Sequence, residues 1–239
     1  MVGYYVVHDC VSLVRHDQQL GGGTAMNEPE RYLSIITNFG CHYECPYCVV
    51  KTNSMDIPRT SIKSLRTLRA AIEHEKANII SVSGGGDPLH EYDKNSKYYK
   101  FLLRMCKNMN IPLEMHTSYL DSNFPYEKCY RVVYHCRDIK QLETIHKRGN
   151  EIIRVVFVVT EDFTNEKIDE IANFVANSDV IDELSFRQMI GKDFRTTNYC
   201  QEYLRASHKD HWWYIEQCDY NPYFVNGTIY YRFVDIGRY

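Results

Sequence analysis

Residues 32–48, YLSIITNFGCHYECPYC, run from an apolar segment directly into three closely spaced cysteines. Cys41, Cys45 and Cys48 follow the spacing C-x3-C-x2-C, and no fourth cysteine lies close to them in sequence. Thiolates are the ligands that iron–sulfur clusters use, and a [4Fe–4S] cluster held by protein alone takes four of them. A loop that supplies three thiolates therefore leaves one iron open for a small-molecule ligand.

A zinc site is the main alternative for the same cysteines. Structural zinc sites usually combine two closely spaced pairs of Cys or His, and this chain has no second C-x-x-C. Three cysteines within eight residues are also unlike buried core cysteines that have no shared role. The spacing therefore favours an iron–sulfur cluster with one open iron.

This stretch resembles the signature of the radical S-adenosylmethionine (SAM) enzymes, which has the same spacing and an aromatic residue, here Tyr47, before the last cysteine. The resemblance implies one [4Fe–4S] cluster on Cys41, Cys45 and Cys48, whose open iron binds the amino and carboxylate groups of SAM. It also implies reductive cleavage of SAM to a 5′-deoxyadenosyl radical, which takes a hydrogen atom from the substrate. Tyr47 is then a cofactor-binding residue, and an electron donor such as flavodoxin or ferredoxin is a partner.

A second motif, Gly84-Gly85-Gly86-Asp87-Pro88, follows the apolar segment at 79–83. Glycine lets a backbone approach a ligand closely, and ligands of parallel α/β folds bind at the carboxyl ends of strands. A tight turn explains a glycine run equally well when the run stands alone. After the cysteine motif, it resembles the Gly-Gly-Glu-Pro motif of the same family, with Asp87 in place of the usual Glu. The resemblance assigns Gly84, Gly85, Gly86 and Asp87 to SAM binding, through a backbone that seats the SAM amino group.

Four further positions near the ends of predicted strands are assigned to SAM by the same resemblance. Ser118 lies where the family often has a Thr-Asn-Gly-like turn, and His135 lies where family members bind the ribose or the carboxylate of SAM. Arg187 and Met189 lie near the place where the family holds adenine. Ordinary roles compete with these: His135, like the nearby His116, also fits a satisfied core or rim histidine, and Arg187 a rim salt bridge.

Apolar segments alternate with helical segments six times between residues 32 and 190. Such alternation predicts a parallel sheet covered by helices, so the fold class is α/β. Six units do not complete the eight of a closed barrel, and the radical SAM family has an open (β/α)6 partial TIM barrel with this count. We expect a single radical SAM domain over residues 1–239, with a core of about 32–190 and a C-terminal extension over 191–239 that shapes the substrate site.

Both ends of the chain extend this core. Residues 2–8 predict a strand in a short N-terminal extension. Residues 199–217 favour a helix, whose aromatic side chains either pack on the surface or line a substrate pocket. This segment contains His208, His211, Trp212 and Trp213. Residues 223–234 carry Asn226-Gly227 at their centre and predict a hairpin with a type I′ turn. We expect this tail to cap the open side or the bottom of the barrel.

The composition is that of an ordinary soluble protein: 25% of the 239 residues are charged and 44% are hydrophobic. A formal net charge of −3 gives no strong signal of nucleic-acid binding. No signal peptide is seen at the start of the chain, and no apolar run approaches membrane-spanning length. Nine cysteines without regular pairing fit a reducing compartment. We therefore expect a cytoplasmic protein with no membrane partner.

The substrate class stays open among three possibilities. The first, which we prefer, is an enzyme that acts on a small-molecule or nucleoside-like substrate. The carboxy-deazaguanine synthases are one such group, although Val49 stands where they have a magnesium-binding Thr. The second is a peptide- or protein-modifying enzyme, namely an epimerase, a maturase or a glycyl-radical activase, in which a thiol such as Cys136 or Cys200 donates a hydrogen atom. The third is a non-enzymatic iron–sulfur or zinc protein.

Overall fold

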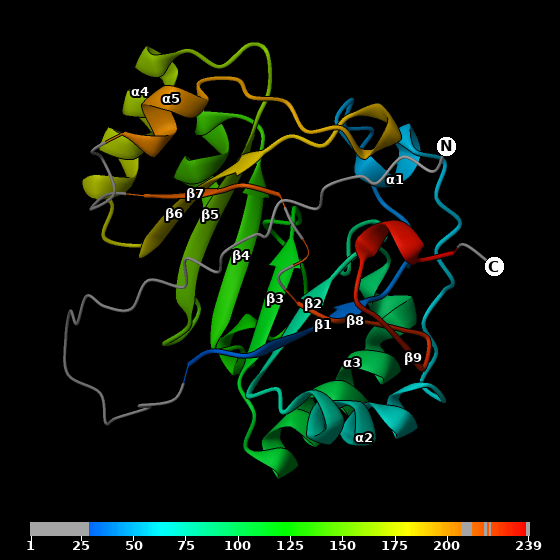
Figure 1. The fold of residues 1–239 in the computed structure, drawn as a ribbon. Coiled ribbons are helices and arrows are strands. Elements are labelled where there is room, and N and C mark those ends of the chain that lie inside the picture. The colour runs from blue at the N-terminus through cyan, green and yellow to red at the C-terminus, as the bar shows by residue number, and fades with distance from the viewer. Residues whose placement is uncertain (1–28, 207–211, 218, 220, 238–239) are drawn as a thin grey trace, which may run out of the picture.

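Parallel strands form the centre of the computed structural model, which describes residues 29–206, 212–217, 219 and 221–237 (Figure 1). The strand predicted at 2–8, and also His208 and His211, lie outside the described residues. The strands are β1 (Tyr32–Ile36), β2 (Ile79–Ser83), β3 (Leu113–Thr117), β4 (Arg131–Cys136), β5 (Ile152–Val159), β6 (Glu183–Gln188), β7 (Trp213–Ile215), β8 (Tyr223–Val225) and β9 (Thr228–Tyr230). The α-helices are α1 (Val49–Thr52), α2 (Leu65–Glu75), α3 (Tyr92–Met109), α4 (Asn165–Ala176) and α5 (Gln201–Arg205). The 3-10 helices are η1 (Tyr126–Lys128), η2 (Ile139–Thr144), η3 (Lys192–Phe194) and η4 (Phe233–Asp235).

The described residues form one sheet of nine strands in the order β7-β6-β5-β4-β3-β2-β1-β8-β9. Neighbouring strands pair in parallel throughout, except for the antiparallel pair β8–β9. This confirms the predicted α/β class with a mostly parallel sheet. The six predicted core strands lie in sequence order, so the carboxyl ends of all six lie along one edge of the sheet.

One face of the sheet is apolar and is covered by helices. Alternate residues such as Leu33, Ile80, Met115 and Phe157 point to this side and belong to a single buried cluster with side chains of α2, α3 and α4. Each residue of this set is less than 4% exposed. Burial of apolar area here is the main source of stability. It stabilises the folded state by about 25 cal/mol for each Å² of apolar surface taken from water.

The opposite face carries polar side chains in the middle of the strands. Ser81 of β2, Glu114 of β3 and Arg131 of β4 are paired in register across neighbouring strands, and each is about 4% exposed. The sequence analysis predicted apolar segments for these strands, and this row of polar residues is the difference. Because burying a charge is costly unless it is paired, these residues need partners within the protein.

Arg131 provides the pairing on this face. Its Nη1 donates to Glu114 Oε2 at 3.0 Å, and its Nε lies 3.1 Å from Glu183 Oε2. Arg154 Nε donates to the same Glu183 oxygen at 2.6 Å. Burial by itself would raise the pKa of Glu114, but His116 and Arg131 outweigh burial and hold that pKa well below its usual range. The face is therefore an ion-pair network in which the buried carboxylate of Glu114 is charged.

The tail departs from the predicted helix at 199–217. Only Gln201–Arg205 is helical within the described part of that segment, and Trp213–Ile215 forms strand β7, parallel to β6. Trp212 is 4% exposed and Trp213 is 50% exposed, an alternation typical of a strand rather than a helix. Gln217 fixes this strand's end by donating through both its backbone and its side chain to Gln188 at 3.0 Å.

The predicted hairpin is confirmed, and it extends the sheet. Asn226 and Gly227 both have positive φ, 45° and 97°, as a type I′ turn requires. Strand β8 pairs in parallel with β1 from Ser34↔Tyr223 to Ile36↔Val225. The tail thus lengthens the sheet at both edges, with β7 beyond β6 and the hairpin beyond β1, because each short strand finds unpaired backbone groups there.

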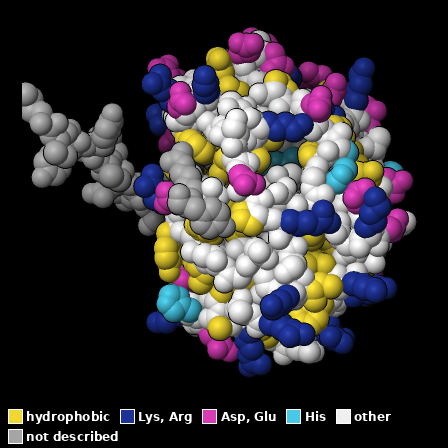
Figure 2. Space-filling model, turned by 90° about the vertical axis from the view of Figure 1, so that its right-hand side faces the viewer, with side chains coloured by type: hydrophobic (Ala, Val, Ile, Leu, Met, Phe, Trp, Pro, Cys, Tyr) yellow, Lys and Arg dark blue, Asp and Glu magenta, His cyan; other side chains and the backbone are white. Residues whose placement is uncertain are grey.

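The outer side of α2 and α3 is basic and partly apolar. Figure 2 shows Lys and Arg side chains gathered around apolar atoms in the lower half of this face. A surface groove of about 460 Å³ lies there. It is lined by Arg69, Phe101, Arg104, Met105, Asn108 and Met109. None of the residues predicted to bind a cofactor lines this groove. Among the described helices, none is both long and apolar enough to cross a membrane.

The Arg131 network generates a stability prediction. Arg131→Met should lower the free energy of unfolding by about 3–5 kcal/mol, because it leaves the buried carboxylates of Glu114 and Glu183 without their shared partner. The measurement is urea unfolding followed by circular dichroism. Arg69→Met is the matched control: its side chain is 71% exposed in an i,i+4 pair with Glu73, and its loss should cost at most about 0.5 kcal/mol. Equal effects of the two substitutions would contradict this account.

Candidate functional site

The three cysteines of the predicted cluster site lie in the loop between β1 and α1. Cys41 is exposed, whereas Cys45 and Cys48 are half-buried. The loop turns tightly, since Cys48 N donates to Cys45 O at 3.1 Å, and Cys48 is the residue from which α1 begins. Lys51 of α1 reaches back and donates to the carbonyl oxygen of Tyr43 at 3.3 Å. Backbone and side-chain contacts therefore shape the loop around its three thiols.

The thiols lie close enough to influence one another. Burial raises the pKa of the Cys41 thiol, and the nearby Asp87, Cys45 and Cys48 raise it further. In the part of the chain that the structure describes, no three His, Cys, Asp or Glu side chains are gathered as ligands of one metal ion. A cubane cluster does not require that arrangement, because each thiolate binds a different iron. The donor set of three thiols in one loop thus fits an iron–sulfur cluster in type and number.

The glycine motif packs directly against the start of the cysteine loop. Asp87 N donates to Gly40 O at 2.8 Å. A Cβ atom added at Gly86 would lie 2.2 Å from that same oxygen, and one added at Gly85 would lie 2.9 Å from Ile57 Cδ1. A side chain at Gly86 would push the two loops apart. Gly86 is therefore required by the close approach of the two backbones.

The carboxylate of Asp87 is turned into the protein and ties the glycine loop to the end of β3. Its Oδ1 accepts from Thr117 Oγ1 at 2.8 Å and from Leu89 N at 2.9 Å, and its Oδ2 accepts from Ser118 N at 2.6 Å. Asp87 is only 3% exposed. These bonds bring the predicted residue Ser118 next to the glycine motif, so that loops after β1, β2 and β3 are joined.

Aromatic side chains connect the cysteine loop to the loops after β3 and β4. The guanidinium carbon of Arg137, directly after β4, lies 3.5 Å from the centre of the Tyr43 ring. The rings of His42 and Tyr119 are 4.3 Å apart. Nδ1 of His42 is buried and has no hydrogen-bond partner among the described residues. Sequence reasoning missed these contacts, because each depends on residues far apart in the chain.

Tyr47 is half-buried within the cysteine loop. Burial is the main cause of its raised pKa, and the neighbouring Cys45 thiol raises the pKa further. The phenol therefore stays protonated near neutral pH and lies beside one of the three cysteines. This places Tyr47 with the cysteines rather than with the glycine motif.

His135 lies on the polar face of the sheet near the end of β4. Its Nε2 is 3.1 Å from Nδ1 of His116, and His116 Nε2 is 2.7 Å from Oε1 of Glu114. Burial lowers the pKa of His135 well below its ordinary value, and His116 and Arg187 lower it further. His135 and Arg187 are thus neighbours on one face of the sheet. Glu114 and His116 complete a hydrogen-bonded chain that the sequence analysis did not identify.

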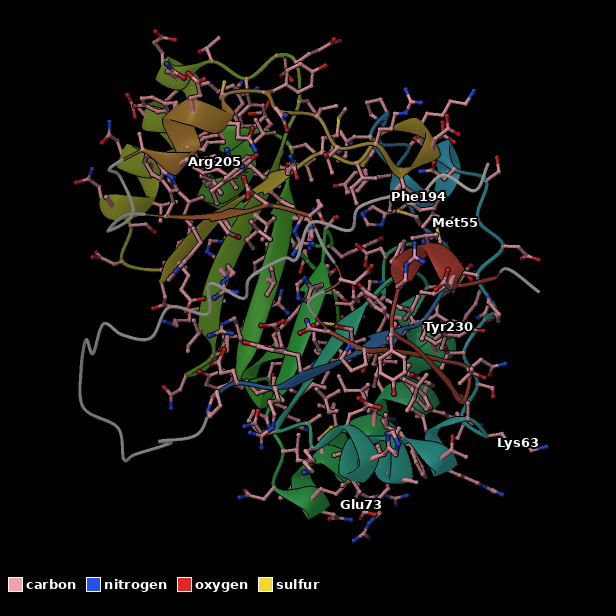
Figure 3. All side chains as sticks on the ribbon, viewed as in Figure 1. Met55, Lys63, Glu73, Phe194, Arg205 and Tyr230 are labelled. Atoms are coloured by element: carbon pink, nitrogen blue, oxygen red, sulfur yellow. The ribbon has the colours of Figure 1, made fainter. Side chains whose placement is uncertain are left out.

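Met189 lies just beyond the end of β6, where its carbonyl oxygen accepts from Thr197 N at 3.1 Å. The segment that follows Met189 reaches the residues just after α1, which follows the first strand of the core. Asn53, just after α1, donates to Gly191 O at 3.1 Å and accepts from Phe194 N at 3.2 Å. Figure 3 shows Met55 and Phe194 on these two neighbouring segments. The loops that follow the first and the sixth strand therefore meet.

The two thiols considered as hydrogen-atom donors occupy different environments. Cys136 is 2% exposed on the apolar face of the sheet, where burial raises its pKa to about 12. Cys200 is half-buried, and its thiol donates to Phe163 O at 3.3 Å. Neither lies in the polar row that contains Glu114 and Arg131. The seven cysteines in the described part of the chain are all free thiols.

Comparison with solved structures identifies proteins of similar fold. The chain is similar to SuiB from Streptococcus suis in a crystal structure bound to S-adenosylmethionine, with a TM-score of 0.50, 16% sequence identity, and coverage of 80% of this chain and 48% of that one. A second SuiB structure gives a TM-score of 0.52 and 16% identity, with 80% and 50% coverage. The chain thus spans about half the length of these proteins. At this identity the likeness establishes the fold.

Comparison of the sequence with protein families and with curated proteins finds no relative. No protein-family model matches this chain. No curated protein matches it either.

The contact between the two loops generates a prediction. Gly86→Ala should lower the free energy of unfolding by about 1–3 kcal/mol, because its methyl group overpacks the site against Gly40. It should also speed hydrogen exchange at the amide of Asp87, which loses its acceptor. Gly191→Ala is the matched control, since a Cβ there has its nearest neighbour, Arg195 O, at an ordinary 3.6 Å. The idea is wrong if Gly86→Ala exchanges and unfolds like the control.

Proposed function

We propose that this chain is a radical SAM enzyme with one [4Fe–4S] cluster held by Cys41, Cys45 and Cys48. The observation that carries the proposal is the contact between two loops at the carboxyl edge of a parallel sheet. The loop that carries the three thiols lies against a glycine motif whose backbone is closely packed. Three thiolates would leave one iron of the cluster open for SAM. When bound, such a cluster supplies the electron for reductive cleavage of SAM, whose 5′-deoxyadenosyl radical then abstracts a hydrogen atom from the substrate.

The chain's own residues hold and orient the reactants. The thiols of the cysteine loop bind the cluster, and Gly84, Gly85, Gly86 and Asp87 position SAM through their backbone. The carboxylate of Asp87 is already used by Thr117, Leu89 and Ser118, so its role is to hold this backbone in place. Aromatic side chains pack around the loop, such as His42 on Tyr119, and help to hold its shape.

The remaining predicted cofactor residues are proposed in the same role. Tyr47 lies beside the cysteines, and Ser118 is hydrogen-bonded to Asp87. His135 and Arg187 are neighbours on the polar face, and Met189 follows the end of the same strand as Arg187. Support also comes from the fold, which is shared with a protein crystallised with SAM bound.

We further propose that the sheet is an open (β/α)6 partial barrel. The contact of Asn53 with Gly191 and Phe194, which joins the loops after β1 and β6, supports this geometry. In this proposal, residues 32–190 form the core of one radical SAM domain and the tail shapes the substrate site. The substrate is a small molecule or is nucleoside-like, the partner is an electron donor such as flavodoxin or ferredoxin, and the compartment is the cytoplasm.

Anaerobic reconstitution tests the proposal. The wild-type chain should bind about four irons, the content of one cluster, and should form 5′-deoxyadenosine from SAM with dithionite as reductant. Cys45→Ala should lose both, because two thiolates do not retain the cluster. The measurements are iron content, absorbance and chromatography of the nucleoside product.

Cys200→Ala is the matched control, since Cys200 is a half-buried thiol outside the cysteine loop. It should keep the cluster and the cleavage activity. Formation of 5′-deoxyadenosine by Cys45→Ala would show that the motif is wrongly assigned. Stoichiometric zinc without iron in the wild-type protein would favour a zinc protein instead.

A further inference from the structure

Three side chains on the polar face form a continuous hydrogen-bonded chain that ends near the carboxyl edge of the sheet. It runs from Glu114 through His116 to His135, with separations of 2.7 Å and 3.1 Å. We propose that Glu114 and His116 are positioning residues that fix the tautomer of His135, so that its Nδ1 accepts a hydrogen bond from an O–H or N–H group of a bound ligand. The identification of that ligand as SAM rests on the proposed function; the tautomer does not.

The first step is the charge of Glu114. Its carboxylate accepts from Arg131 Nη1 and from Ser81 Oγ, each at 3.0 Å. These donors and the neighbouring His116 keep its pKa well below the usual range, although burial acts in the opposite direction. An ionised carboxylate can only accept hydrogen bonds. The nitrogen of His116 that faces it, Nε2, must therefore carry the proton.

The second step is the charge of His116. The two carboxylates of this network, Glu114 and Glu183, are already balanced by the guanidinium groups of Arg131 and Arg154. A protonated His116 would add an uncompensated charge to a site where its side chain is only 13% exposed. A neutral imidazole has one donor and one acceptor nitrogen. Since Nε2 donates to Glu114, Nδ1 of His116 is an acceptor.

The third step transfers this polarity to His135. Its Nε2 must donate to Nδ1 of His116, and a neutral His135 then has a lone pair on its own Nδ1. Burial and the guanidinium of Arg187 favour the neutral form of His135 by lowering its pKa. Within the part of the chain that the structure describes, Nδ1 of His135 has no hydrogen-bond partner. The chain therefore ends in an acceptor without a donor.

A second polar atom in the same row also lacks a partner. Register pairs His135 with Val156 and Val156 with Ser185, so His135 and Ser185 lie two strands apart on the same face. Ser185 is 0% exposed, and its hydroxyl has no hydrogen-bond partner among the described residues. Two strand spacings are roughly 9.6 Å. Ser185 and the intervening Val156 are both buried, so a ligand is expected to contact His135 alone, and its group there must be a hydrogen-bond donor rather than a carboxylate or phosphate.

The isosteric substitution Glu114→Gln gives a sharp test of this polarity. Arg131 Nη1 needs an acceptor at the Oε2 position, so the amide oxygen of Gln stays there and the NH₂ group replaces Oε1. That NH₂ group then donates to Nε2 of His116, and the hydroxyl of Ser81 turns to accept. The proton of His116 moves to Nδ1, and His135 changes to the tautomer with a proton on Nδ1. The substitution should thus reverse the whole chain.

The experiment is NMR of the full-length protein labelled with ¹⁵N-histidine, at pH 8, where an ordinary histidine is neutral. His135→Gln assigns the signals of His135 by their disappearance. Wild-type His135 should be the Nε2–H tautomer, and Glu114→Gln should convert it to the Nδ1–H tautomer. Glu183→Gln is the matched control, because Glu183 also pairs with Arg131 but has no contact with His116 among the described bonds; it should leave the tautomer unchanged.

Binding provides the second readout. SAM titrated into reconstituted Glu114→Gln should bind about tenfold more weakly than to wild type or Glu183→Gln, the loss expected for one neutral hydrogen bond. The Nδ1–H tautomer in wild-type protein would overturn the proposal, and this readout needs only the assignment variant His135→Gln. Unchanged SAM affinity in a Glu114→Gln protein with reversed tautomer would overturn the ligand contact. The NMR result needs neither cluster nor SAM, so failure of the proposed function leaves it intact.

Discussion

The hydrogen bond from Asp87 N to Gly40 O is the contact on which the arrangement of the candidate site depends. It is 2.8 Å long and joins the loop after β2 to the first residue before the cysteines. The parallel sheet makes it possible, because the carboxyl ends of β1 and β2 lie at the same edge. The absence of a side chain at Gly86 makes it short, since a Cβ there would lie 2.2 Å from Gly40 O. Sheet topology and a single glycine thus bring together two motifs that carry different chemistry.

The two faces of the sheet serve different purposes. The apolar face supplies stability through burial against α2, α3 and α4. The polar face contributes less to the free energy of folding, because replacing buried ion pairs with well-packed apolar residues is often neutral or stabilising. Arg131 limits the cost by serving both Glu114 and Glu183. The hydrogen-bonded network leads from the middle of the strands to His135 at the carboxyl edge of the sheet.

Local signals in the sequence predicted much of this structure, and long-range pairing could not be predicted. The cysteine loop, the glycine motif after β2 and the Asn226-Gly227 turn each depend on neighbouring residues, and the structure contains them where the sequence placed them. Strand β7 was missed because three residues carry too little periodicity, and it forms only because β6 offers an unpaired edge. The bonds of Asn53 to Gly191 and Phe194 join residues that are 138 and 141 positions apart, for which one sequence gives no signal. The sequence shows charged residues such as Glu114 of β3 and Arg131 of β4, but it does not show that they pair with each other.

Asp87 shows how a departure from a family motif follows from packing. The radical SAM motif that the sequence resembles usually has Glu at this position. Here the carboxylate is 3% exposed and accepts from Thr117 Oγ1, Leu89 N and Ser118 N. An additional methylene would have to fit into this closed space, and overpacking of such a site typically costs about 1–3 kcal/mol. The shorter side chain holds the glycine loop to the end of β3 while the backbone of the motif stays against Gly40. The packing around this carboxylate therefore favours the shorter acid at this position.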